Sequence, residues 1–294
     1  MKALLKNQDL QTQLNADGYI SMPFLNEQEL EQARNFYKEI HPDGEALGKI
    51  DGIHMTTWCE DYDYKMKVAH FLDGLYERAC EENFIDFRRL NNVFIVKSPG
   101  EGTTFKVHQD WNVVDEKENF AINVWVPLYD VDATTGALWT VKGSHQINRH
   151  VRGSAYLFPD YSPFYNELEQ VATSVNLKAG HAIVFYLNVI HGSPPNLGEK
   201  ERIATCFSII PEKAPLSIYF QKQQGDPLEL HEPADDFMYQ YKSLRTDTFE
   251  FAPTKEPIEL LPSYENKPIT REELDFCLKK DQKSTWLTRF LKKN

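Results

Sequence analysis

Two short stretches far apart in the sequence carry side chains that could together bind a metal ion: His108 with Asp110, and His191. His108 and Asp110 are separated by one residue, so in an extended strand both side chains would project from the same side. His191 could close a three-ligand face on the ion. Two imidazoles and one carboxylate leave about three positions of an octahedral ion open, which is the facial triad of non-heme Fe(II) oxygenases.

An isolated His-x-Asp pair is most often a solvated or hydrogen-bonded surface pair, so the prediction depends on the surrounding sequence. Runs rich in β-branched and aromatic residues, which are typical of strands, flank both parts of the candidate site. They lie at 92–97, 121–128, 181–186 and 203–210. Arg202 opens the last of these runs. This context favours a metal site built on a β structure over a chance pair.

In their order and spacing, these motifs resemble the phytanoyl-CoA dioxygenase-like branch of the Fe(II)/2-oxoglutarate-dependent oxygenases. The resemblance covers roughly residues 15–212. The motifs that carry it are Asp17-Gly18-Tyr19-Ile20, the His108/Asp110 pair, Thr135-Gly136-Ala137-Leu138, Gly143-Ser144-His145, His191-Gly192-Ser193 and Arg202. The resemblance implies Fe(II), 2-oxoglutarate as co-substrate, O2, and a small-molecule substrate.

The resemblance also implies roles for single residues. His108, Asp110 and His191 would bind Fe(II), whereas His145 would support the fold and not bind the metal. Arg202 matches the arginine that the family uses against the 2-oxoglutarate carboxylate, because a planar guanidinium binds a carboxylate with two hydrogen bonds. Further candidates for the co-substrate site are Lys97, Asn92, Asn123, Trp125 and Ser193, with Thr205 a weaker one.

Roles unrelated to the co-substrate remain open for these further candidates. Lys97 and Asn92 could equally be outward-facing strand residues, and Trp125 could serve core packing as well as the site. Alternation along 120–129 predicts Asn123 and Trp125 on one face of a strand and the valines between them on the other.

The reaction that the resemblance implies is oxidation of the substrate, usually hydroxylation, coupled to conversion of 2-oxoglutarate to succinate and CO2. Three alternatives remain. A halogenase would need a small residue in place of Asp110. A non-catalytic cupin-like binding module would keep the barrel without iron. A cupin-type isomerase or sugar-binding barrel commonly has a richer set of histidines.

Composition narrows the class of protein. The 294 residues, 41% of them hydrophobic, suffice for one large core. A net charge of −12 argues against a nucleic-acid partner. Four widely spaced cysteines predict free thiols in a reducing cytoplasm. No apolar run predicts a signal peptide or stable membrane insertion. We expect a monomer or homodimer.

The pattern along the chain predicts a mainly β fold with flanking helices around a double-stranded β-helix, or jelly-roll, core. We expect one domain over 1–294: helical support at 1–83, the core at about 84–222, and a mostly irregular extension at 223–294. Helices are predicted at 26–40, where Asn26 and Glu29 form a capping box, and at 60–82. Gly192 and the prolines after it predict a turn after His191.

Two further segments have open interpretations. The aromatic-rich insertion at 146–172 could be a lid or substrate wall, or an ordinary packed excursion. The basic, amphipathic segment at 286–293 could touch a membrane or a partner, although a solvated or docked terminal helix is the more common outcome.

Overall fold

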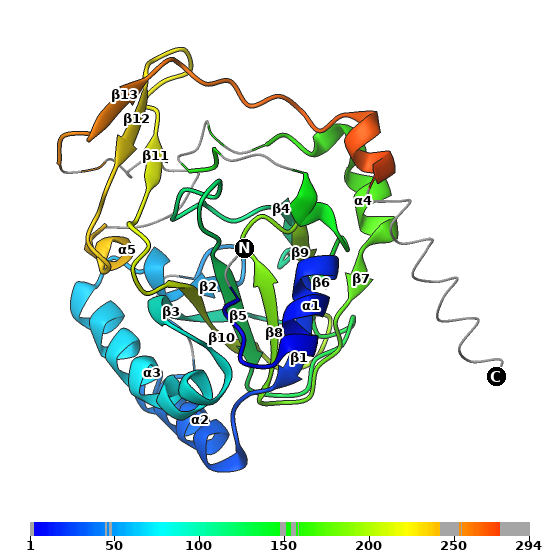
Figure 1. Cartoon of the computed structure of the whole chain (residues 1–294). Helices are drawn as coiled ribbons and strands as arrows, with labels where there is room; N and C mark the ends of the chain where they lie inside the picture. The colour runs from blue at the N-terminus through cyan, green and yellow to red at the C-terminus, as the bar shows by residue number, and fades with distance from the viewer. Residues whose placement is uncertain are drawn as a thin grey trace.

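The computed structural model describes residues 3–44, 46, 49–147, 151–153, 157, 159–241, 253 and 255–276. These residues form three antiparallel sheets with helices packed against them (Figure 1). The six-stranded sheet has the order β1-β8-β5-β10-β3-β2, the four-stranded sheet β4-β9-β6-β7, and the three-stranded sheet β11-β12-β13. The prediction of a mainly β fold with flanking helices is confirmed.

The bounds of the described elements follow the chain. The strands are β1 (Tyr19–Pro23), β2 (Ile53–Met55), β3 (Phe87–Lys97), β4 (Phe105–His108), β5 (Ile122–Pro127), β6 (Trp139–Thr140), β7 (Thr173–Ser174), β8 (His181–Tyr186), β9 (His191–Ser193), β10 (Arg202–Pro211), β11 (Ile218–Phe220), β12 (Leu228–His231) and β13 (Glu259–Leu261). The helices are α1 (Gln8–Asp17), α2 (Glu27–Ile40), α3 (Tyr62–Asn83), α4 (Tyr165–Val171) and α5 (Phe237–Gln240).

Helices α2 and α3 lie along one face of the six-stranded sheet (Figure 1). The predicted capping box begins α2: the Asn26 side chain accepts from the Glu29 amide, and the Glu29 carboxylate accepts from the Asn26 amide, both at 2.9 Å. Aromatic rings fill the interface between helices and sheet. Tyr76 of α3 stacks on Phe207 of β10 with ring centroids 4.3 Å apart. This face therefore serves packing.

The other face of the six-stranded sheet points toward the four-stranded sheet. The rings of Phe185 on β8 and His191 on β9 lie 4.8 Å apart across the two sheets. Strand β9 continues through Ser193, so the chain leaves the strand only at the two prolines, two residues later than predicted. Gly192 instead permits a close approach, because a Cβ at this position would lie 2.6 Å from the Trp139 ring and 2.8 Å from the Phe105 carbonyl oxygen.

The terminal segments contain more strand than the sequence predicts. The N-terminal segment adds β1 and β2 to the two edges of the six-stranded sheet, so it is not a purely helical support. In the C-terminal extension, β12 pairs with β11 on one side and with β13 on the other. From β13 the chain crosses to α4, where residues 271–276 form a helical turn (Figure 1). The segment 286–293 lies outside the described residues.

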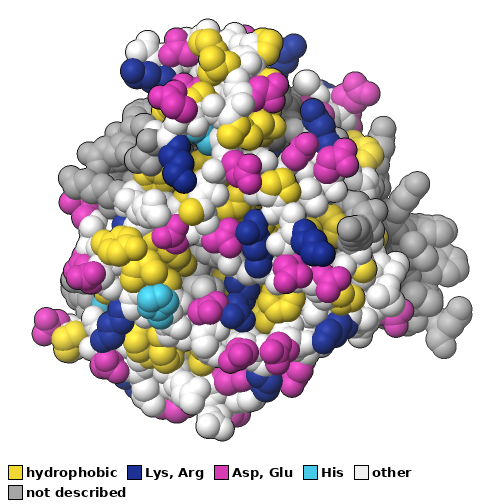
Figure 2. Space-filling model, turned by 60° about the vertical axis from the view of Figure 1, so that its left-hand side comes forward, with side chains coloured by type: hydrophobic (Ala, Val, Ile, Leu, Met, Phe, Trp, Pro, Cys, Tyr) yellow, Lys and Arg dark blue, Asp and Glu magenta, His cyan; other side chains and the backbone are white. Residues whose placement is uncertain are grey.

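The charge distribution on the described surface agrees with the acidic net charge of the sequence. Figure 2 shows a face on which acidic and basic side chains are interspersed rather than gathered into one basic field. Among the described residues, no helix combines the length and the hydropathy that a membrane span requires.

Candidate metal centre

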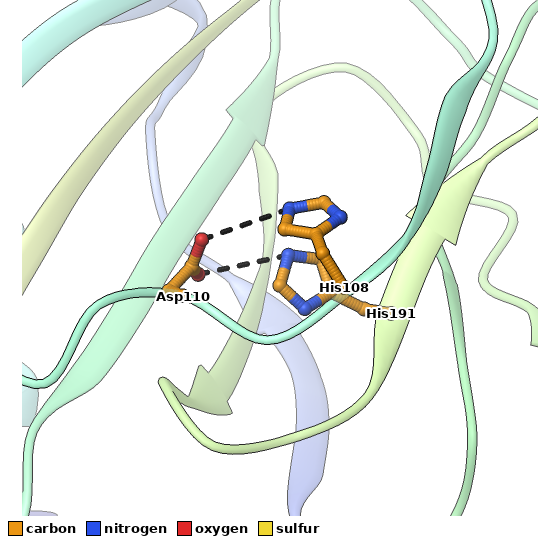
Figure 3. Close-up of side chains that lie close together, drawn as sticks. All are labelled: His108, Asp110 and His191. Carbon is orange, nitrogen blue, oxygen red and sulfur yellow. Dashed lines mark ion pairs between the residues drawn. The ribbon is translucent and has the colours of Figure 1, made fainter. Parts of the chain in front are cut away.

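Strand pairing brings the two histidines together. His108 of β4 and His191 of β9 are register partners, and their ring centroids lie 4.2 Å apart. Asp110 approaches both rings, with Oδ1 3.7 Å from His108 Nε2 and Oδ2 3.6 Å from His191 Nε2 (Figure 3). Two ligands that each bond one ion at about 2.1 Å can be this far apart. The three side chains therefore fit a common metal ion.

Asp110 is not on the strand that carries His108, contrary to the expectation from their spacing. Strand β4 ends at His108, and residues 109–121 have no regular strand or helix. The carboxylate nevertheless faces the rings, because the irregular segment is held by other contacts. The Asp110 amide donates to the Leu187 carbonyl oxygen at 2.9 Å, next to the segment that leads to His191.

Backbone carbonyls select the tautomer of both histidines. Nδ1 of His108 lies 2.7 Å from the Lys106 carbonyl oxygen, and Nδ1 of His191 lies 2.9 Å from that of Val189. A carbonyl only accepts, so each Nδ1 carries the proton and each Nε2 keeps a free lone pair. Burial, and next the neighbouring His108, lower the pKa of His191 to about 4. His191 is therefore neutral at neutral pH, as a metal ligand must be.

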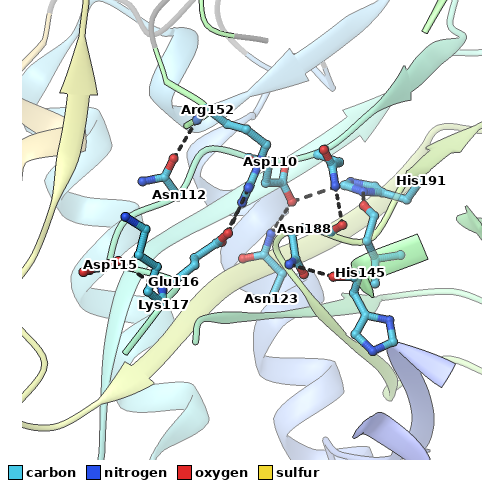
Figure 4. Close-up of polar contacts among 12 residues, drawn as sticks. Asp110, Asn112, Asp115, Glu116, Lys117, Asn123, His145, Arg152, Asn188 and His191 are labelled. Atoms are coloured by element: carbon cyan, nitrogen blue, oxygen red, sulfur yellow. Dashed lines mark hydrogen bonds and ion pairs between the residues drawn. The ribbon is translucent and has the colours of Figure 1, made fainter. Parts of the chain in front are cut away.

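A chain of hydrogen bonds from the six-stranded sheet orients Asp110. The Asn123 amide nitrogen on β5 donates to Asp110 Oδ2 at 2.7 Å (Figure 4). The Ser208 hydroxyl on β10 donates to the Asn123 oxygen at 2.6 Å. Asn123 therefore contacts a metal-ligand candidate directly. The sequence interpretation missed Ser208. Its even spacing from Arg202 along β10 would have placed it on the same face of the sheet.

Arg202 is a buried cation without an acidic partner in the described part of the chain. Its side chain is only 5% exposed, and neither Nε nor Nη1 has a hydrogen-bond partner there. Its guanidinium carbon lies 5.1 Å from the centre of the Trp125 ring. Burial lowers the pKa of Arg202 to about 9. Buried charges are normally paired, so this arrangement suits an anionic ligand.

Lys97 lies beside Arg202 and connects it to the histidine strand. The two residues are register partners on β3 and β10. Lys97 is fully buried, and its Nζ donates to the Ser193 hydroxyl at 2.6 Å and to the Pro194 carbonyl oxygen at 2.7 Å. Burial, and next the charge of Arg202, lower the pKa of Lys97 to about 6. Ser193 is two residues beyond His191 on β9, so the two basic residues adjoin the triad.

Two candidates for the co-substrate site, Asn92 and Thr205, lie on the helix-facing side of the six-stranded sheet, away from the triad. The Asn92 amide is 3.5 Å from the Asp73 carboxylate of α3, on the side where the helices pack. The Thr205 hydroxyl donates to the Val126 carbonyl oxygen at 3.4 Å and shares the face of Phe207. The physical reason is alternation: Asn92 and Lys97 differ by an odd number of positions and cannot face the same side of a strand.

His145 lies away from the triad, in agreement with its exclusion as a ligand. Its Nε2 is 3.1 Å from the Asn15 carbonyl oxygen, and its ring stacks on Tyr186 with centroids 5.4 Å apart. Gln109 supports the site instead. Its amide donates to the Asn188 carbonyl oxygen and accepts from the Tyr161 hydroxyl, both at 2.5 Å. Tyr161 belongs to the insertion, and nothing in the sequence indicated this contact.

The sequence itself matches a known family. Residues 14–204 match the family described as Phytanoyl-CoA dioxygenase (PhyH). The chain belongs to this family. The resemblance inferred from the motifs is thus confirmed over nearly the same residues.

Two plant proteins of the family show how far the similarity extends. "Phytanoyl-CoA dioxygenase" of Arabidopsis thaliana is 28% identical over 172 residues, which are 57% of this chain and 56% of that protein. "Phytanoyl-CoA dioxygenase 1" of Oryza sativa subsp. japonica is 30% identical over 186 residues, 62% of this chain and 60% of that protein. The chain thus matches less than two thirds of the length of these relatives.

Solved structures show the same fold. The non-heme alpha ketoglutarate dependent carbocyclase SnoK from nogalamycin biosynthesis superposes with a TM-score of 0.53 at 18% identity, over 71% of this chain and 86% of SnoK. The epimerase SnoN, solved with Fe3+, alpha ketoglutarate and nogalamycin RO, gives 0.53 at 16% identity, over 90% of this chain and 96% of SnoN. The likeness confirms the predicted jelly-roll class.

Proposed function

We propose that this chain is an Fe(II)- and 2-oxoglutarate-dependent dioxygenase that hydroxylates a small organic substrate with release of succinate and CO2. One observation carries the proposal: a three-ligand group with two free Nε2 atoms adjoins a buried arginine that has no acidic partner among the described residues. A 2-oxo diacid has one end for a metal and another for a guanidinium, so it suits both features.

Each residue of the site has a distinct task in this proposal. His108 and His191 bind Fe(II) through Nε2, and Asp110 binds it through a carboxylate oxygen that Asn123 orients. Two neutral imidazoles and one carboxylate leave the ion with a net positive charge, which attracts the dianion of 2-oxoglutarate. When bound, Fe(II) supplies the activation of dioxygen for substrate oxidation. The protein supplies orientation and a site shielded from water.

The distal carboxylate of 2-oxoglutarate would bind Arg202 through the unpartnered Nε and Nη1 atoms. Lys97 adds a second hydrogen-bond donor beside Arg202, holds the Ser193 hydroxyl, and so shapes the end of the co-substrate site. Trp125 forms a wall against the guanidinium. Asn92 and Thr205 have no part in this site, because their side chains contact the helix-facing side of the sheet.

The substrate and the location of the enzyme extend the same proposal. The aromatic residues of the insertion, among them Tyr161, favour a partly apolar or ring-containing substrate. We propose a cytoplasmic enzyme, because the described cysteines Cys59, Cys80 and Cys206 are free and buried. Cys277 lies outside the described residues. Succinate release with candidate substrates, measured in turn, tests the substrate class.

An anaerobic titration tests the cofactor part of the proposal. Fe(II) and then 2-oxoglutarate are added to the folded protein, and the weak visible metal-to-ligand charge-transfer band is recorded. We expect the band in the wild type and its loss in His191→Ala and Arg202→Ala. Well-folded protein that gives no band would contradict the proposal and favour a non-catalytic binding module.

A further inference from the structure

The three metal-ligand candidates differ in what holds their backbones. His108 and His191 are fixed by strand pairing between β4 and β9. Asp110 lies in the irregular segment 109–121, where no strand ladder fixes the backbone. Apart from the hydrogen bond of the Asp110 amide to the Leu187 carbonyl oxygen, its position depends on side chains from elsewhere in the chain.

Arg152, from the insertion at 146–172, provides such contacts. Its Nε donates to the Asp110 carbonyl oxygen at 2.7 Å. Its two terminal nitrogens donate to Glu116, Nη1 to Oε2 at 2.9 Å and Nη2 to Oε1 at 2.6 Å. Its backbone amide donates to the Asn112 side-chain oxygen at 2.7 Å. One residue of the insertion thus joins the beginning and the end of the segment 110–116 (Figure 4).

Burial makes this connection rigid. The Arg152 side chain is fully buried, and the Glu116 side chain is only 7% exposed. Neither charge can leave the pair without leaving the other buried and unpaired. The planar guanidinium also fixes the direction of all three hydrogen bonds, which the single ammonium of a lysine cannot reproduce.

The backbone next to Arg152 is packed closely against β11. A Cβ on the next residue, Gly153, would lie 2.3 Å from the carbonyl oxygen of Tyr219 on β11. Contacts this close to backbone atoms do not occur, so only glycine permits the approach. Arg152 and Gly153 therefore lie between β11 and the segment that carries Asp110.

We propose that Arg152 and Glu116 are positioning residues that set the place of the Asp110 carboxylate relative to His108 and His191. This inference rests on the proposed function, because it assumes that the triad binds a metal. It assigns to residues 151–153 of the insertion a task in metal binding, distinct from that of a lid over the substrate. Groups that orient metal ligands typically change metal affinity about 10–100-fold when they are altered.

The test compares metal affinity in two conservative variants, Arg152→Lys and Glu116→Gln, in the full chain. Fe(II) is titrated anaerobically, and Mn(II) is titrated as a redox-stable probe, without 2-oxoglutarate or substrate. We expect affinity to fall about 10–100-fold in each variant. The double variant should lose less than the two single losses combined, because the residues act as one unit.

Arg78 and Glu29 provide a matched control pair far from the triad. Arg78 donates to both Glu29 oxygens, at 2.7 and 2.6 Å, and to the Phe24 carbonyl oxygen at 2.9 Å, so it shares with Arg152 a carboxylate and a backbone carbonyl as acceptors. Unlike Arg152, it also donates to Glu82 and is 38% exposed. Arg78→Lys and Glu29→Gln should leave metal affinity unchanged. Thermal unfolding of the metal-free proteins separates a loss of stability from a loss of affinity.

The outcomes distinguish this inference from the proposed function. Wild-type affinity in folded Arg152→Lys and Glu116→Gln would overturn the positioning role alone. An equal loss of affinity in the control pair would also overturn it, because the effect would then be general. If Arg152→Lys fails to fold, Glu116→Gln decides, since it keeps the size of the side chain. Absence of metal binding in the wild type would overturn the proposed function and this inference together.

Discussion

The two faces of the six-stranded sheet have opposite characters although they are built from the same strands. The face toward α2 and α3 is packed with aromatic rings, including Phe94 and Phe207. The face toward the four-stranded sheet carries Arg202, Lys97 and Asn123, of which Arg202 and Lys97 are buried basic residues.

This difference shows how one sheet separates stability from chemistry. The helix-facing side buries apolar surface against α2 and α3, and this burial stabilises the fold. The inner side buries charge, which opposes folding unless a ligand compensates for it. Substitutions on the helix-facing side should therefore change mainly the free energy of unfolding. Substitutions on the inner side should change mainly the binding of metal or co-substrate.

The largest effect is expected at the metal. Asp110→Ala should abolish 2-oxoglutarate-dependent release of succinate, because two histidines alone no longer form the three-ligand face. The fold should persist, since the Asp110 side chain is partly exposed and its backbone contacts remain. Succinate formation and thermal unfolding are measured together. Full activity in this variant would show that the triad is assigned incorrectly.

The next effect belongs to the helix-facing side. Phe207→Ala should lower the free energy of unfolding by about 3–5 kcal/mol, because it leaves a cavity against the Tyr76 ring. Metal affinity measured below the melting temperature should stay near that of the wild type. Chemical denaturation of the metal-free protein gives the first quantity. A large change in affinity with little change in stability would reverse the proposed division between the faces.

In contrast to Phe207→Ala, Arg202→Met should change binding and leave stability intact. The requirement for 2-oxoglutarate should rise about 10–100-fold, since hydrogen bonds to charged groups contribute about 1.5–3 kcal/mol. Stability of the co-substrate-free protein should be unchanged or higher, because a buried unpaired cation is removed. The matched control is Asn92→Ala, on the helix-facing side, which should leave the requirement unchanged. Equal effects in both variants would place the co-substrate elsewhere.

The last effect, which is the smallest when taken per pH unit, is a pH dependence of stability from Lys97. Burial lowers the folded-state pKa of Lys97 to about 6 from an ordinary value of 10.5. Between these values the unfolded chain binds a proton that the folded chain lacks, so stability should rise with pH. The contribution is at most about 1.4 kcal/mol per pH unit. Unfolding of the wild type and of Lys97→Met is compared across pH 6–10 in the absence of ligand. Identical pH profiles would show that Lys97 keeps its proton when buried.

The metal triad could be predicted because the type of a side chain decides whether it can bind a metal ion. His108, Asp110 and His191 are the residues that the resemblance indicated, and their ligand atoms all lie within 4.8 Å of one another. The helices could be predicted for a similar reason, since the capping box at Asn26 and the apolar stripes act over neighbouring residues.

The further co-substrate candidates were harder to predict. Lys97, Asn123 and Trp125 lie on the inner face, whereas Asn92 lies against α3. Polarity alone made Asn92 and Lys97 look equivalent, although strand alternation sets them on opposite faces. The strands β12 and β13 were missed because short pairings in a proline-rich segment leave little periodic signal.

The sequence by itself determined the ligand types, the family and the mainly β class, because these depend on residue identity and on local periodicity. The tertiary structure alone decided how Asp110 is held. Arg152 is 42 positions away from Asp110 in the sequence, and no spacing rule connects them. The same holds for Lys97 and Ser193, which are 96 positions apart and meet only where two sheets face each other. Contacts of this kind depend on how sheets and insertions pack, and packing is a property of the whole chain.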